Sequence, residues 1–161
     1  MKKNAVMLVT MVAAMMAFGA TDAQAQIRSG GKIGLGLGGG SGVNGLSLKY
    51  FTSDAQALQF TAGLYGWGGG FSALGLSADY LFELPTLLNA GPLDIAWNVG
   101  VGAGAVVGDV FALRASGVVG LEFLFVPIPI DLVFEWRPSL QIIPNVGADI
   151  VNFSGHVRYY F

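Results

Sequence analysis

The stretch at residues 150–161, IVNFSGHVRYYF, alternates between two kinds of side chain. Because successive side chains of a β-strand point to opposite faces, one face would be apolar or aromatic up to Phe161. The other face would carry the polar groups of Asn152, Ser154, His156 and Arg158. Strands of membrane-spanning barrels alternate in this way, with apolar side chains facing lipid and polar side chains facing inward. The stretch therefore predicts one strand of such a barrel.

The composition narrows the choice of fold. The chain has 161 residues, of which 53% are hydrophobic and 11% are charged, whereas soluble domains carry about 25% charged residues. After residue 26, no window offers the roughly 18–20 consecutive apolar residues of a transmembrane helix. The two remaining possibilities are a very buried soluble β-domain and a membrane β-barrel.

The N-terminus has the three parts of a secretory signal peptide. Lys2 and Lys3 form a basic region, residues 5–20 are apolar, and Ala23-Gln24-Ala25 has the pattern of a cleavage site. We predict a signal peptide over residues 1–25 and an outer-membrane barrel domain over residues 26–161, with an N-terminal membrane anchor as the alternative to the signal peptide. The predicted domain carries six basic and nine acidic side chains and no cysteine. It therefore offers no basic patch for nucleic acid, no disulfide framework and no thiolate metal site.

The same alternation recurs along the chain in segments of about ten residues, separated by residues typical of turns. The predicted strands cover residues 32–38, 46–51, 57–65, 72–82, 93–105, 111–125, 130–141 and 150–161. Glycine-rich turns are predicted at residues 38–45 and 66–70, and the longest turn at residues 83–92. Together these segments predict an all-β fold, an eight-stranded antiparallel up-and-down transmembrane barrel with short loops and with both chain ends on one side.

The charged residues favour a membrane barrel over a soluble one. Within the predicted strands, every charge falls on the face that carries His156. A charge on the lipid face at the membrane midplane would cost about 2–4 kcal/mol, whereas a soluble ligand-binding barrel would place its apolar side chains inside. We predict a polar and ion-pair network that fills the interior, with a narrow pore for ions or small solutes as the alternative. Its predicted members are Lys49, Asp79, Asp94, Arg114, Glu122, Asp131, Glu135, Arg137, His156 and Arg158.

Aromatic residues on the apolar face are predicted to form a girdle at the membrane interface. These residues are Tyr50, Tyr80, Trp97, Trp136, Tyr159 and Phe161. A platform for carbohydrate or aromatic ligands is the alternative interpretation.

The signal peptide, the eight alternating segments and the terminal sequence VRYYF resemble the small outer-membrane barrels of Gram-negative type. This superfamily includes the OmpA transmembrane domain, OmpX and OmpW. The segments GVNGLSLKY and DLVFEWRPSLQIIP are also similar to a family of short outer-membrane proteins for which no activity is known. The resemblance implies an outer-membrane location, contact with its lipids, and recognition of the last strand by the barrel-assembly machinery. We expect a monomer, and the short predicted loops argue against an adhesin.

Ser154, His156 and a carboxylate such as Glu135 contain the groups of a hydrolase triad. Some outer-membrane lipases and deacylases use such groups, but those sites must meet lipid, and these residues are assigned to the inward face. We therefore predict a structural, non-enzymatic protein with no catalytic residue, no cofactor and no metal site. A lipid-modifying outer-membrane enzyme is the second alternative after the pore.

Overall fold

The structure is a computed structural model that describes residues 27–40, 43–65, 73–108 and 111–161. The predicted signal peptide and the predicted glycine-rich turn at residues 66–70 lie outside these ranges. Within them, no helix is long and apolar enough to cross a membrane. The regular structure described is entirely β-strand.

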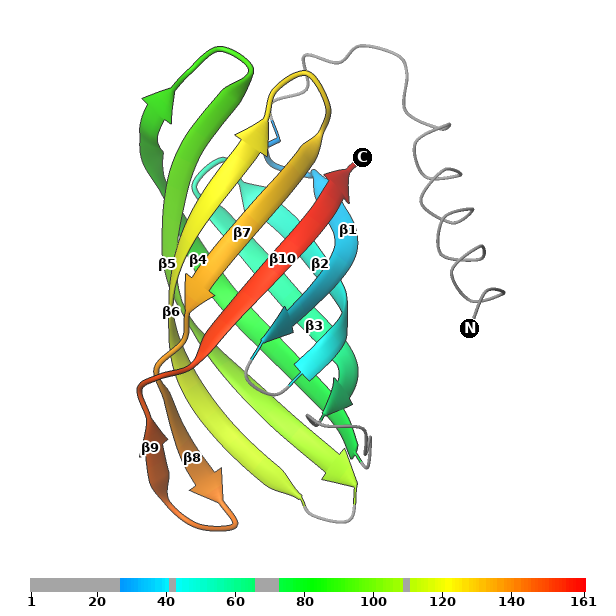
Figure 1. Cartoon of the computed structure of the whole chain (residues 1–161), viewed down its shortest axis with the longest axis vertical. Helices are drawn as coiled ribbons and strands as arrows, with labels where there is room; N and C mark the ends of the chain where they lie inside the picture. The colour runs from blue at the N-terminus through cyan, green and yellow to red at the C-terminus, as the bar shows by residue number, and fades with distance from the viewer. Residues whose placement is uncertain (1–26, 41–42, 66–72, 109–110) are drawn as a thin grey trace, which may run out of the picture.

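Ten strands make up the fold. They are β1 (Ile33–Gly40), β2 (Val43–Ser53), β3 (Gln56–Tyr65), β4 (Ala73–Asn89), β5 (Leu93–Gly108), β6 (Ala112–Phe125), β7 (Ile130–Trp136), β8 (Ser139–Ile143), β9 (Gly147–Asp149) and β10 (Phe153–Tyr160). Neighbours pair antiparallel, and the pairing of β10 with β1 closes the sheet (Figure 1). Because β7 with β8, and β9 with β10, each occupy one strand position, the ten strands form a closed eight-stranded up-and-down barrel. This fold class is the one that the sequence predicts.

The two ends of the barrel differ. At one end, here called the terminal end, the last residue returns to the first strand, where Phe161 N donates to Ile33 O at 2.9 Å. At the other end, called the hairpin end, β8 and β9 form a hairpin that projects beyond β10 (Figure 1). In the described residues, β9 pairs with β8 alone.

The last two strand positions are interrupted, although the sequence predicts continuous strands at residues 130–141 and 150–161. Proline has no N–H for the ladder, and Pro138 lies in the break between β7 and β8. Nearby groups hold the break together: Arg137 N donates to Asn152 O at 2.7 Å, and the Trp136 indole donates to Ile150 O at 2.7 Å. Beyond the break, β8 continues the pairing with β6, and β9 pairs with β8 as the second strand of the hairpin.

Two predicted turns are wrong. The long turn at residues 83–92 is largely strand, because β4 continues to Asn89. Pro85 is accommodated because the register with β5 shifts between Leu84 and Leu88. The glycine-rich segment at residues 38–45 is also mostly strand, and only residues 41–42, which lie outside the described ranges, separate β1 from β2.

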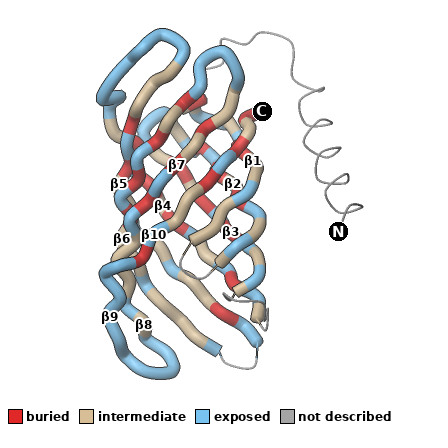
Figure 2. The backbone as a smooth tube through the Cα atoms, viewed as in Figure 1, coloured by how far each residue is buried: buried red, intermediate tan, exposed pale blue. Residues whose placement is uncertain are grey.

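Residues alternate between more buried and more exposed along the strands (Figure 2). On β2, Ser47 and Lys49 are buried, whereas Leu46 and Tyr50 are exposed. The large apolar side chains are therefore mostly on the outside and most of the charges are inside. The terminal end is an exception, since a buried apolar cluster lies there, made of Ile27, Phe51, Ala57, Leu81, Ala96, Val118, Leu124 and Tyr160.

Candidate functional site

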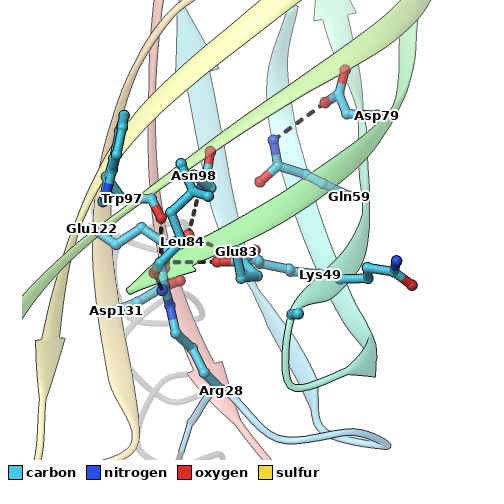
Figure 3. A network of polar contacts seen from close by, with 12 residues as sticks. Arg28, Lys49, Gln59, Asp79, Glu83, Leu84, Trp97, Asn98, Glu122 and Asp131 are labelled. Carbon is cyan, nitrogen blue, oxygen red and sulfur yellow. Dashed lines mark hydrogen bonds and ion pairs between the residues drawn. The ribbon is translucent and has the colours of Figure 1, made fainter. Parts of the chain in front are cut away.

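Two groups of buried charges lie inside the barrel. The first, called the terminal cluster, contains Arg28, Lys49, Glu83 and Glu122 (Figure 3). The Lys49 ammonium lies 2.7 Å from Glu83 and also pairs with Glu122. Arg28 Nη2 lies 2.8 Å from Glu83 and 2.7 Å from Glu122. Two cations therefore meet two carboxylates, and the Asn98 amide donates a further hydrogen bond to Glu122.

Sequence reasoning missed two members of the terminal cluster. Arg28 precedes the first strand, so strand alternation gives no information about its direction. The structure shows its guanidinium donating to Leu84 O at 2.6 Å and to Trp97 O at 3.0 Å, in addition to its carboxylate partners. Glu83 was assigned to a turn, although it continues the alternation of Asp79, which could have revealed its inward direction.

The second group, called the central cluster, begins with Arg158 of β10. Its guanidinium donates to Asp131 of the neighbouring strand β7, with Nη2 at 2.8 Å, and to the Gln59 amide oxygen on β3. Tyr160 also donates to Asp131, at 2.7 Å. The Asp131 carboxylate therefore has both a cationic and a neutral donor, as a buried charge requires.

Arg137 completes the central cluster toward the hairpin end. It donates to Asp79 at 3.0 and 2.5 Å and to Glu135 at 2.8 Å. Gln59 donates to the same two carboxylates, at 3.2 and 2.8 Å, and so joins them to Arg158. The cluster therefore crosses the inside of the barrel from β3 and β4 to β7 and β10.

With His156, whose Nε2 lies next to Glu135, eight of the ten residues predicted for the interior belong to these two clusters, and Asp94 and Arg114 do not. Asp94 is half-buried, and its Oδ1 has no hydrogen-bond partner among the described residues. Arg114 lies near the hairpin end, where its Nη2 is 3.4 Å from the Tyr65 hydroxyl. Its guanidinium carbon also lies 5.7 Å from the centre of the Tyr65 ring.

Ser154, His156 and Glu135 lie close together, but Ser154 is not the hydroxyl beside the imidazole, as a hydrolase triad would require. Ser154 donates to Glu135 at 2.8 Å, and His156 Nε2 lies 3.2 Å from the same carboxylate oxygen. The hydroxyl beside the imidazole belongs to Ser47, whose Oγ lies 2.9 Å from His156 Nδ1. Ser47 comes from the opposite end of the chain, so only the closure of the barrel brings it there. Its exposed fraction is 0%, so this hydroxyl has no contact with lipid or solvent.

The described residues contain no group of three or more His, Asp or Glu side chains that could hold a metal ion. Among the buried carboxylates, Glu122 pairs with Arg28, Asp79 with Arg137, and Asp131 with Arg158.

The six residues predicted for the aromatic girdle have exposed or half-buried side chains. Five of them lie toward the terminal end. There Tyr80 contacts Phe82 and Tyr159 contacts Phe161, each with ring centres 5.1 Å apart. Trp136 lies nearer the hairpin end, at the end of β7. A membrane girdle for these residues stays a prediction.

Comparison with known proteins found no matching family model, no matching curated protein and no matching solved structure. The resemblance to the OmpA, OmpX and OmpW superfamily therefore stays a prediction. The structure is a closed eight-stranded antiparallel barrel with buried ion pairs inside it, and this much agrees with the expectation.

Proposed function

We propose that this protein is an integral outer-membrane β-barrel of structural, non-enzymatic character, with an interior filled by polar side chains and ion pairs. The observation that carries the proposal is that large apolar side chains lie on the outside of the barrel and charged side chains lie inside, which is the reverse of a soluble fold. Val101, Leu46 and Phe134 are 64%, 58% and 56% exposed on the outer surface, whereas Lys49 and Glu122 are 0% exposed. In water, such a surface would far exceed the few hundred Å² of apolar patch found on soluble monomers. The hydrocarbon of a lipid bilayer is the environment in which this apolar outer surface would be stable.

The exposed charges fit the same proposal. Within the described residues, the exposed charged side chains are Asp54 and Asp149. Asp54 lies in the turn between β2 and β3, and Asp149 ends β9 in the projecting hairpin. Neither lies in the middle of the outer wall, where a charge facing hydrocarbon would be expensive. A closed ladder also leaves few backbone groups without partners, which a lipid environment demands.

The two charge clusters support a filled interior. An eight-stranded barrel is just wide enough for its own side chains to fill it. Here the terminal cluster joins the N-terminal segment to β2, β4 and β6, and the central cluster joins β3 and β4 to β7 and β10. With the apolar cluster at the terminal end, these contacts would block a continuous water path. The protein would then act through its presence in the membrane rather than by conduction or catalysis.

The expected surroundings follow from this function. Outer-membrane lipids would cover the apolar wall, with the aromatic residues near the terminal end fixing its depth. The barrel-assembly machinery would recognise the last strand, which ends on Phe161. The chain would be exported with its signal peptide and would work as a monomer.

Fractionation of a Gram-negative host that expresses the protein tests the location. We expect the protein in the outer membrane after an alkaline carbonate wash, and we expect its migration in detergent gels to change on boiling, because folded barrels resist detergent. Periplasmic release together with identical migration before and after boiling would contradict the proposal.

A narrow pore is the second candidate, and a cavity of about 60 Å³ at the hairpin end favours it, because this cavity reaches Arg137. Planar-bilayer recording of the pure protein separates the two functions. We expect no steady current from the natural chain. The matched variant Asp131→Ser/Arg158→Ser removes a buried ion pair without leaving a lone charge, and we expect it to show a measurable current. A steady current through the natural chain would favour the pore.

A further inference from the structure

A cavity of about 60 Å³ lies inside the barrel at the hairpin end. Its lining residues come from β1–β6, from the break between β7 and β8, and from β10 with the break before it, and therefore surround the cavity. A cavity needs about 10–15 Å³ of this kind of volume for each water, so the space accommodates a few water molecules or one small ion. Its size excludes a sugar or a lipid chain.

Glycine and apolar residues make up much of the cavity lining, and its charged side chains are cationic. Arg114 and Arg137 line the cavity, and no carboxylate lines it. Several hydroxyl groups also face it, among them those of Ser77 and Ser116. Both hydroxyls line the cavity and can donate to a guest.

Arg114 differs from the other interior cations. Arg28, Lys49, Arg137 and Arg158 each have a carboxylate within ion-pair distance. Within the described ranges, Arg114 has no such partner, and its neighbours across the sheet are Gly104 and Gln141. Gly104 also makes room for it, because an added Cβ there would lie 3.2 Å from Arg114 Cγ.

Among the described residues no carboxylate pairs with the half-buried Arg114 guanidinium, and the free energy of the site improves when an anion neutralises this charge. The planar fork of arginine donates parallel hydrogen bonds to two oxygens of one anion, which suits phosphate or sulfate. Hydroxyl donors on β4 and β6 can bond the remaining oxygens of such an anion. On the terminal side, the ion pairs of Arg137 with Asp79 and Glu135 lie next to the cavity, so an anion would enter from the hairpin end.

We propose that this cavity is a binding site for a small tetrahedral oxyanion, phosphate or sulfate. Arg114 supplies the charge, and Ser77 and Ser116 supply neutral hydrogen-bond donors. The oxyanion is either free in solution or the terminal group of a larger solute that remains outside the cavity. The site requires neither conduction nor catalysis, and it is independent of the structural function proposed above.

Calorimetric titration of the folded protein in a maltoside detergent, which has no phosphate, tests the site. Inorganic phosphate and sulfate are the probes, chloride is the competitor, and gel migration verifies that each variant is folded. We expect saturable binding that Arg114→Gln weakens by roughly tenfold or more, because a hydrogen-bonded charge is lost. Arg114→Lys should retain part of the affinity, since it keeps the charge without the fork.

Lys32→Gln is the matched control, because it removes one positive charge next to β1 at the terminal end, and we expect the affinity to stay unchanged. If Arg114→Gln does not fold, Ser77→Ala/Ser116→Ala provides a second test and should also weaken binding. Repeating the titration in nanodiscs that contain phosphatidic acid distinguishes the sources, since the terminal phosphate of this lipid would compete with inorganic phosphate if it entered the cavity. Absence of saturable binding, equal displacement by chloride, or equal effects of Arg114→Gln and Lys32→Gln would overturn the proposal.

Discussion

At the scale of single residues, each buried charge in the barrel depends on several partners. Glu122 accepts from Arg28, Lys49 and Asn98, so its carboxylate compensates two cations that have no contact with solvent or only a little. Exchanging a whole buried ion pair for apolar residues often leaves the stability of a protein unchanged, whereas removing one partner leaves an uncompensated charge and lowers the stability. The terminal cluster is therefore sensitive to single substitutions.

Glu122→Gln tests this sensitivity. We expect a loss of about 3–5 kcal/mol in the free energy of unfolding, because Arg28 and Lys49 then share only the Glu83 carboxylate. Urea unfolding in detergent micelles, followed by the boiling-dependent gel shift, measures the loss. The control Asp54→Asn neutralises an exposed carboxylate, and it should change stability by no more than about 0.5 kcal/mol. Equal effects of the two substitutions would show that the buried cluster does not stabilise the fold.

Two adjacent tyrosines offer a finer comparison. Tyr160 faces inward and its hydroxyl donates to Asp131 at 2.7 Å, whereas Tyr159 lies on the outer face. Tyr160→Phe should lower the free energy of unfolding by about 1.5–3 kcal/mol, the range for a hydrogen bond to a charged group. Tyr159→Phe should leave it nearly unchanged in the same urea titration. The reverse order would mean that the last strand has its faces exchanged.

At the scale of elements, glycines allow neighbouring strands to approach closely. Gly45 on β2 is paired with Gly63 on β3. A Cβ added at Gly45 would collide with the Ala62 carbonyl and the Gly63 Cα, and one added at Gly63 would collide with the Asn44 carbonyl and the Gly45 Cα. This contact explains why a segment that is so rich in glycine is a strand rather than a long turn.

Gly45→Ala should therefore lower the free energy of unfolding by about 1–3 kcal/mol, the usual range for overpacking. Gly147 on β9 is the matched control, because an added Cβ there would meet no atom within 4 Å. Gly147→Ala should leave stability unchanged or raise it by up to about 1 kcal/mol, since alanine restricts the unfolded chain. Equilibrium unfolding of both variants measures the difference, and an equal loss in both would contradict close packing between β2 and β3.

At the scale of the whole molecule, an apolar outer wall surrounds a charged interior. If lipid covers this wall, the cost of a new surface charge must depend on its position along the barrel axis. Val101 lies within β5 and is 64% exposed, and Val146 lies in the turn of the projecting hairpin and is 78% exposed. A soluble barrel would tolerate arginine equally well at both positions.

Val101→Arg should destabilise the protein folded in phospholipid bilayers by about 2–4 kcal/mol. Val146→Arg should change stability by no more than about 0.5 kcal/mol. Reversible unfolding from vesicles by guanidinium chloride measures both values. Similar small effects at the two positions would argue against a bilayer around the middle of the wall.

The sequence by itself determined the fold class and the direction of most side chains. The period of two is a local property of the strand, so a reader of the sequence can separate Ser47 and Lys49 from Leu46 and Tyr50 without any tertiary information. The same period gave the eight strand positions, because each repeats it between turn residues. The break between β7 and β8 was not predicted, because the strand predicted at residues 130–141 runs through Pro138, although proline cannot donate to the ladder.

Only the tertiary structure decided which interior groups meet. Arg28 pairs with Glu122 across 94 residues of chain, and Ser47 meets His156 across 109. Such pairs depend on the register and closure of the whole barrel, and no local period contains that information. For the same reason, alternation placed Arg114 inside the barrel with the other cations, whereas only the closed structure shows that none of the described carboxylates lines the cavity beside it.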